Sequence, residues 1–253
     1  MRLHRSKAAG ACLLLAGWLL TAAAAAASQP WVVEAGEDDL LVKRAADAET
    51  VFSARRYMAE RVAEGFQQVS FDREPRGCAV VFEVRALSVL GDALSLEITF
   101  RRLPEKDCGR SFGYHGVKVV ALEDSEDLRL QRYVDTDAVM SVLRREPQVI
   151  ELLGPEAAST TSLPDLFARL DEVAGGQCHR RLPPSSESTF YLADTDTPAL
   201  ELRIPWHNQC GQLADEPQLD SLSVTLTTDD LKPGVVPQVL TAPELQLMFE
   251  EPR

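Results

Sequence analysis

The residues with the most recognisable metal chemistry are two cysteines and two histidines in the second half of the chain. Cys178 and His179 are adjacent, and His207 stands three positions before Cys210. Two thiolates and two imidazoles can hold zinc in tetrahedral geometry. Adjacent Cys178 and His179 would have difficulty pointing at one ion, however, and an oxidising compartment favours a disulfide. We therefore predict a disulfide and no metal site.

Two Asp-x-Asp pairs carry the oxygen ligands that calcium prefers. They are Asp135 with Asp137 and Asp194 with Asp196, and neither is followed by the glycine and distal glutamate of a hand-type loop. Aspartate is equally common at helix caps and turns, which is the structure that we predict for both pairs. With 39 acidic residues in the chain, chance pairs of carboxylates are inevitable, and their spacing alone identifies no hydrolytic site.

The search for enzyme motifs is negative. The sequence contains no nucleophile elbow, zinc-protease helix, phosphate loop or dinucleotide fingerprint. Past the leader described next, the histidines are His115, His179 and His207, which limits mechanisms that need a histidine base. We predict no catalytic and no cofactor-binding residue.

Residues 1–27 have the organisation of a secretory signal peptide. Three basic residues precede an apolar segment, which ends in a run of alanines at Ala27. Small residues before the cut are what signal peptidase needs, so we predict cleavage after Ala27 and a location in the periplasm or outside the cell. Residues 8–27 are also just long enough to span a bilayer, which leaves an uncleaved anchor as the alternative. Because alanine is only weakly apolar, we favour cleavage and no stable membrane insertion afterwards.

The exported part of the chain is strongly acidic. The whole sequence has a formal net charge of −13, and the leader holds three of its 26 basic residues and none of its 39 acids. An acidic surface repels phosphate backbones and anionic lipid. The composition therefore argues against nucleic-acid binding and peripheral membrane binding.

The cysteines of the exported part indicate disulfides. An even number in an exported chain is typical of paired cysteines, although four of them allow three pairings. These residues are Cys78, Cys108, Cys178 and Cys210. The similar separations within the first and second pairs favour Cys78–Cys108 and Cys178–Cys210, each closing a loop of about 30 residues and contributing roughly 3–4 kcal/mol.

The pattern of secondary structure repeats around these two cysteine pairs. In the first half, Asp47 is a possible cap for a helix with apolar residues from Val51 to Val69, and period-two alternation predicts strands over 80–84, 94–100 and 117–121. In the second half, Ser162 and Asp165 begin a helix that ends at Gly175 and Gly176. Strands are predicted around 190–192, 200–204 and 222–226.

The remaining segments have weaker signals. Asp135 is a predicted cap of a short helix that Pro147 closes, and 149–153 is predicted as a brief strand. Residues 31–33 and 40–42 read as edge strands, and the prolines after residue 232 favour a looping strand over a helix at the C-terminal end. Trp206 stands where the first half has Phe100, which favours a packing role for this tryptophan.

These elements predict an α+β fold of two tandem, duplicated modules, each an amphipathic helix packed on a small antiparallel sheet and stapled by one disulfide. The predicted divisions are residues 28–153, a linker at 154–161, and residues 162–253. One continuous α+β domain is the alternative. For function, we expect a non-enzymatic exported protein that binds another protein or an envelope component. The alternatives are a hydrolase with an unrecognised carboxylate site and a structural or assembly protein.

Overall fold

The computed structural model describes residues 29–63, 79–102, 112–123, 125, 127–174, 180–181, 188–195, 199–205, 207–208 and 221–250. It has a mixed α+β architecture with several antiparallel sheets. Several residues that the sequence singles out lie outside the described residues, and the predictions made for them stay predictions. They are Cys78, Cys108, Gly175, Gly176, Cys178, His179, Asp196, Trp206 and Cys210.

The central sheet is an antiparallel meander completed by the end of the chain. Its strands are β4 (Ala79–Leu90), β5 (Ala93–Arg102), β6 (Phe112–Ala121), β12 (Pro237–Val239) and β13 (Leu245–Glu250). β5 pairs with β4 on one side, and β12 and β13 pair with β4 on the other. The three strands predicted over 80–121 are confirmed. The last two strands lie within 162–253, which the sequence assigns to the second module, yet they pair with a strand of the first.

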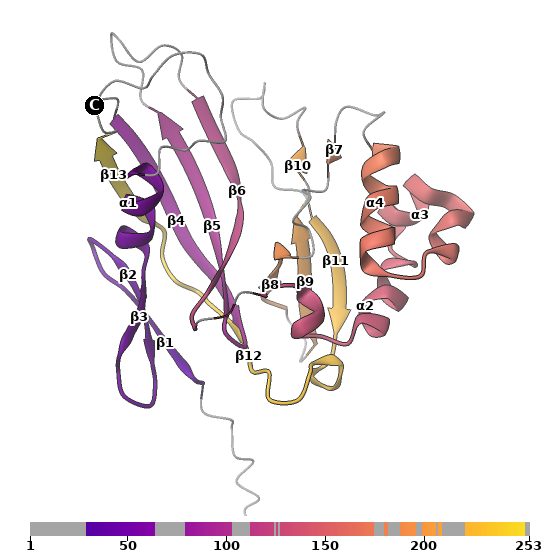
Figure 1. Ribbon diagram of the computed structural model, residues 1–253, viewed down its shortest axis with the longest axis horizontal. Coiled ribbons are helices and arrows are strands. Elements are labelled where there is room, and N and C mark those ends of the chain that lie inside the picture. Colours follow the sequence, from indigo (N-terminus) through magenta and orange to yellow (C-terminus); the bar gives the residue numbers. More distant parts are fainter. Residues whose placement is uncertain are drawn as a thin grey trace, which may run out of the picture.

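One face of the central sheet packs against the N-terminal part of the chain (Figure 1). This part consists of β1 (Trp31–Ala35), β2 (Leu40–Arg44), β3 (Thr50–Ser53) and α1 (Ala54–Ala63). Leu40 and Met58 contribute to the same buried cluster as Phe82, Leu96 and Phe100 of the central sheet. The strands predicted at 31–33 and 40–42 are confirmed, and alternation supplies the apolar face that they cover.

The first helix begins later than predicted. Val51 lies in β3, which pairs with β2, and the helix starts at Ala54. Asp47 does not cap it, because its side chain accepts hydrogen bonds from Arg44 and from the backbone of Glu49. Instead, the Asp39 carboxylate accepts the backbone N–H of Arg55 at 2.9 Å. A carboxylate brought by a distant turn thus satisfies a donor at the start of the helix.

A second antiparallel sheet is covered by helices on its apolar face (Figure 1). The sheet contains β8 (Tyr191–Ala193), β9 (Leu200–Pro205) and β11 (Ser221–Leu226), and the helices are α2 (Thr136–Leu143), α3 (Pro147–Leu153) and α4 (Leu163–Ala174). A short pair, β7 (Arg180–Arg181) with β10 (His207–Asn208), lies beside α4. The predicted strands are confirmed. The prediction of one covering helix is wrong, because α2 and α3 add their apolar residues to the same core.

The segment between the predicted modules is helical. Residues 149–153 belong to α3 and not to a strand, because Pro147 occupies the first turn of this helix, where its fixed φ is favourable and its missing N–H costs nothing. The following residues form the 3₁₀ turn η2 (Gly154–Ser159). Ala157 within this turn is 2% exposed, and Thr160 directly after it is 1% exposed. The predicted linker is therefore packed against the helices.

A β-bulge in β4 separates two parts of the second face of the central sheet. The register of β4 against β5 shifts between Ala86 and Ser88, so Ser88 lies opposite Ser95 on the same face as Glu97. There the Ser88 hydroxyl accepts the N–H of Leu192 at 2.8 Å, and the Ser95 hydroxyl donates to the carbonyl of Phe190 at 2.6 Å. These two bonds connect the two sheets. The other end of the same face is not covered by β8.

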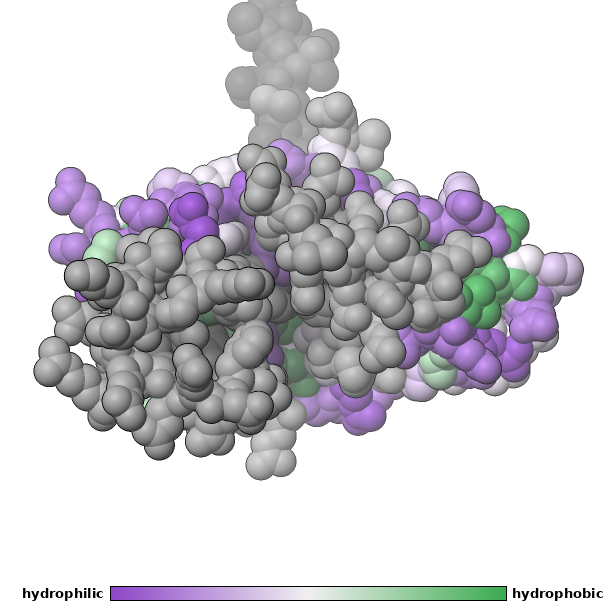
Figure 2. All heavy atoms as spheres, turned by 90° about the horizontal axis from the view of Figure 1, so that it is seen from above, coloured by the Kyte–Doolittle hydropathy of each residue, from purple (hydrophilic) through white to green (hydrophobic). Residues whose placement is uncertain are grey.

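On the face drawn in Figure 2, the described residues are mainly hydrophilic. Figure 2 shows hydrophobic atoms at the end of the molecule formed by the helices, where Ile150 and Val173 are 49% and 40% exposed. Of the described helices, none has both the length and the apolar character needed to cross a membrane.

Candidate functional site

A charged hollow lies on the face of the central sheet that β8 leaves uncovered. Its volume is about 240 Å³. The lining side chains come from three neighbouring strands and from the residue before β13, and they are Glu83, Arg85, Glu97, Thr99, His115 and Glu244. Acid, base, hydroxyl and imidazole groups therefore meet in one place, which makes the hollow the candidate site.

Strand register brings these side chains together. Alternate residues of a strand point to the same face, and directly opposite residues on paired strands are neighbours. Arg85 of β4 lies opposite Glu97 of β5. Thr99 of β5 lies between Glu83 of β4 and His115 of β6. The floor of the hollow is thus a grid of cross-strand pairs.

Glu97 is the centre of the ionic contacts in the hollow. Its Oε2 accepts a hydrogen bond from Arg85 Nε at 2.9 Å and a second from the same guanidinium. Its Oε1 lies 2.8 Å from His115 Nε2. The side chains of Glu97 and His115 are 20% and 17% exposed, so the pair is shielded more than an ordinary surface pair. One carboxylate therefore contacts both the guanidinium of Arg85 and the imidazole of His115.

These contacts keep Glu97 ionised. The hydrogen bond from His115 and then the charge and hydrogen bond of Arg85 lower the pKa of Glu97, against the opposing effect of burial. A general acid needs a raised pKa so that it keeps a proton near neutral pH. The pKa of Glu97 is shifted in the opposite direction, which does not suit a general acid.

The other lining side chains of the hollow differ in whether they have a hydrogen-bond or ion-pair partner. The carboxylate of Glu83 forms an ion pair with Arg101 on the adjacent strand. The Thr99 hydroxyl and the exposed Glu244 carboxylate have no hydrogen-bond or ion-pair partner among the described residues. Two groups of the lining thus remain able to contact a ligand.

Asp135, Asp137 and Asp194, the described members of the Asp-x-Asp pairs, do not line the hollow. Asp135 is the N-cap of α2, and its Oδ1 accepts the backbone N–H groups of Asp137 and Ala138 at 2.8 and 3.3 Å. The predicted cap is confirmed. Asp194 is exposed after β8. In the described part of the chain, no three or more histidine, cysteine or acidic side chains are grouped so as to hold a metal ion.

A buried polar cluster surrounds Asp92 in the turn between β4 and β5. Asp92 is 7% exposed, and its Oδ1 accepts the phenolic hydrogen of Tyr133. Its Oδ2 accepts a hydrogen bond from Ser125 and lies 3.2 Å from the guanidinium of Arg132. Burial and the bond to Asp92 raise the pKa of Tyr133, so the phenol keeps its proton. Because every group here has a partner, the cluster is an anchor of the fold.

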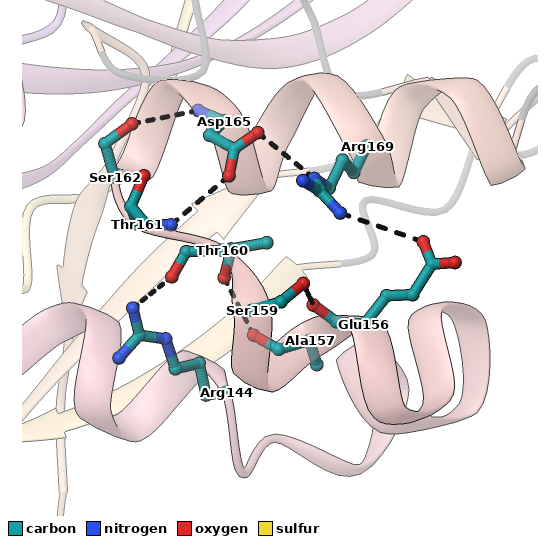
Figure 3. Close-up of polar contacts among 9 residues, drawn as sticks. All are labelled: Arg144, Glu156, Ala157, Ser159, Thr160, Thr161, Ser162, Asp165 and Arg169. Atoms are coloured by element: carbon teal, nitrogen blue, oxygen red, sulfur yellow. Dashed lines mark hydrogen bonds and ion pairs between the residues drawn. The ribbon is translucent and has the colours of Figure 1, made fainter.

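A second polar cluster lies at the start of α4 (Figure 3). Ser162 Oγ accepts the N–H of Asp165 at 3.3 Å, as the predicted cap requires. The Asp165 carboxylate accepts the N–H of Thr161 at 3.2 Å, one residue earlier than in a capping box. The predicted start of the helix is therefore confirmed. The second bond of the cap differs from the prediction, because Asp165 accepts the N–H of Thr161 and not that of Ser162.

The rest of this cluster links α4 to its neighbours. Arg169 reaches Asp165 at 3.1 Å and Glu156 at 3.8 Å (Figure 3). Arg144, which follows α2, donates to the carbonyl of Thr160. These side chains satisfy backbone groups and tie consecutive helices together, so their role is structural.

The sequence contains the lining residues of the hollow, but only the register of the strands shows that they lie together. Glu83, Arg85, Glu97 and Thr99 occupy the polar positions of two alternating strands, which is typical of any solvated sheet face. His115 stands out only as one of few histidines. Their convergence depends on strand pairing, which the sequence pattern does not specify.

No family model matches the chain, and no curated protein matches its sequence. The chemistry of the hollow is therefore inferred from its own side chains.

Proposed function

We propose that the protein is an exported, non-enzymatic binding protein that holds another protein or an envelope component through the hollow on the central sheet. The observation that carries this proposal is the double engagement of Glu97 by Arg85 and His115. The lowered pKa of Glu97 keeps its charge in place, whereas paired-carboxylate hydrolysis needs one acid that retains a proton. A fixed, charged and partly open surface suits recognition.

Export and disulfide pairing belong to the same proposal. Trp31 of β1 follows the predicted cleavage site closely in sequence, is 4% exposed, and donates its indole N–H to the carbonyl of Gly91 at 2.7 Å. We infer a cleaved signal peptide and a location in the periplasm or outside the cell from the organisation of residues 1–27.

The sequence positions of the cysteines relative to the described strands bear on the predicted pairing. Arg180 pairs with Asn208, and Cys178 and Cys210 each stand two residues beyond that pair. Cys78 directly precedes β4, whose Val80 pairs with Arg102, and Cys108 follows in the connection from β5 to β6. Directly opposite residues of antiparallel strands have the separation that a disulfide needs. This register favours Cys178–Cys210, and Cys78–Cys108 follows as the remaining pair.

The order of elements supports the proposed duplication. α1 is followed in sequence by the meander β4–β5–β6, and α4 by the antiparallel strands β8, β9 and β11. Two similar halves would arise if one such unit had been copied. The additional helices and the C-terminal strands would then be later additions to it.

The experiment is capture of the partner by crosslinking in an extract of the compartment to which the protein is exported. Thr99→Trp fills the hollow with a large side chain, and Thr225→Trp places the same side chain on an exposed position of β11. We expect a defined crosslinked product with the natural protein and with Thr225→Trp, and loss of this product with Thr99→Trp. Absence of any product, or equal capture by both variants, would refute the proposal.

A further inference from the structure

We propose that the group received by the hollow is a cationic side chain, a lysine or arginine of the partner protein. The inference rests on the proposed function and names the chemistry of the ligand. It depends on the size of the hollow, on its balance of charge and on the two lining groups, Thr99 and Glu244, that have no partner in the part of the chain that the structure describes.

The volume of the hollow favours a single side chain over a free small molecule. Pockets for drug-sized ligands and cofactors are typically about 300–1,000 Å³ and enclose most of the ligand. The hollow has a volume of about 240 Å³ and opens on a sheet face. One long side chain of a protein partner fits such a space, and the rest of the partner would lie on the surrounding surface.

The balance of charge selects a cation. Arg85 is committed to Glu97, and Glu83 is committed to Arg101. Glu244, the third carboxylate of the lining, pairs with no cation among the described residues. The net charge of −13 for the whole chain adds a long-range attraction for basic partners. A ligand that brings one positive charge would complete the ionic pairing.

The position of Glu244 fits this role. Leu245, the next residue, is opposite Val84 in the pairing of β13 with β4, so Glu244 lies at the edge of the grid that Arg85 and Glu97 form. The Thr99 hydroxyl lies on the floor of the same hollow and can accept a hydrogen bond from an ammonium or guanidinium group. A cation entering here meets a carboxylate at the edge and an acceptor below.

The test is a titration of the full mature chain with N-acetylarginine amide and N-acetyllysine amide, followed by the NMR amide signals of Thr99 and His115. N-acetylcitrulline amide, which has nearly the shape of the arginine probe without its charge, is the control ligand. We expect saturable shifts with at least one cationic probe and weaker binding of citrulline. Glu244→Gln should weaken the cation about two- to fivefold, as expected for a partly exposed ion pair.

Glu172→Gln is the matched control variant, because it removes the same charge from an exposed position on α4. It should bind the cationic probe as the natural chain does. The inference is overturned if neither cation produces saturable shifts, if citrulline binds as well as arginine, or if Glu244→Gln and Glu172→Gln behave alike.

The two proposals fail separately. If Thr99→Trp no longer captures the partner while the natural chain binds neither cationic probe, only the choice of a cationic side chain is wrong. If Thr99→Trp still captures the partner, the hollow is not the binding site, and the proposed function is refuted with it.

Discussion

Tyr133 donates its phenolic hydrogen to the carboxylate of Asp92 across 3.0 Å, in a contact between residues that are 1% and 7% exposed. The bond joins the turn between β4 and β5 to the segment that leads into the helices. Trp31 donates to the carbonyl of Gly91 in the same turn, and the N–H of Gly91 donates to the carbonyl of Val236. Segments from the start, the middle and the end of the described chain therefore meet at two turn residues.

Tyr133→Phe removes this hydrogen bond and leaves the ring in place. Hydrogen bonds to a charged acceptor are worth about 1.5–3 kcal/mol, so we expect the free energy of unfolding to fall by that amount in urea denaturation. Tyr191→Phe is the control, because its hydroxyl forms no hydrogen bond to the described residues, and it should change the free energy of unfolding by less than about 0.5 kcal/mol. Equal stability of the two variants would show that Asp92 does not need Tyr133.

Gly91→Ala tests the space and the backbone conformation at the same turn. Gly91 has a φ of +63°, and a Cβ there would lie 3.2 Å from Cδ1 of Tyr133. Gly234 has a φ of +83° with open space around it. The left-handed backbone costs an L-residue roughly 1–2 kcal/mol at either position. We expect Gly91→Ala to be more destabilising than Gly234→Ala in thermal or urea unfolding. The same loss in both would mean that the ring of Tyr133 moves aside freely.

The acid sensitivity of the hollow follows from Glu97. Its pKa lies below the ordinary value of 4.5 in the folded protein, so the unfolded chain binds more protons in this range. The contribution of the ionised Glu97 side chain to the free energy of unfolding is complete above about pH 4.5. It is lost as the pH falls through the pKa of Glu97 in the folded protein. Glu97→Gln cannot titrate and should lose less stability over the same interval in acid unfolding curves.

His115→Gln addresses the cause of this shift. The hydrogen bond from His115 is its largest contribution, so the pKa of Glu97 should move up toward 4.5 in an NMR titration of the carboxyl group. Arg85 remains in this variant and continues to lower the pKa in part. A Glu97 pKa that is the same with and without His115 would contradict the assignment.

The proposed disulfides predict a specific peptide map. Digestion without reduction should give two linked peptide pairs, Cys78 with Cys108 and Cys178 with Cys210. Reduction should lower the free energy of unfolding by roughly 3–4 kcal/mol for each loop of about 30 residues. A bond that joins the two halves, or four free thiols, would rule out the pairing and the duplicated, separately stapled modules.

Much of the local structure follows from the sequence because its causes are local. Alternation of Leu94, Leu96 and Ile98 with polar residues predicts β5, and Asp135 predicts the start of α2. The errors occur where a short pattern has two meanings. Val51 fits a helical stripe, yet pairing with β2 places it in a strand, and Pro147 both follows one helix and begins the next.

The candidate site could not be predicted from the sequence because its geometry is not local. Glu83, Arg85 and Glu97 are ordinary residues of a polar sheet face until the register decides that Arg85 meets Glu97. That register depends on the turn at Gly91 and on the bulge before Ser88. One residue more or fewer between these points would pair the same charges differently.

The pairing of β12 and β13 with β4 has a consequence for the order in which the protein is made. β4 begins at Ala79, yet the strands that occupy its outer side start only at Pro237 and Leu245. While the chain is being synthesised, that side of β4 lacks β12 and β13 and remains a template for wrong strand pairing. The described central sheet can be completed only after β13 has been synthesised, and truncation before residue 237 would remove both strands that pair with this side of β4.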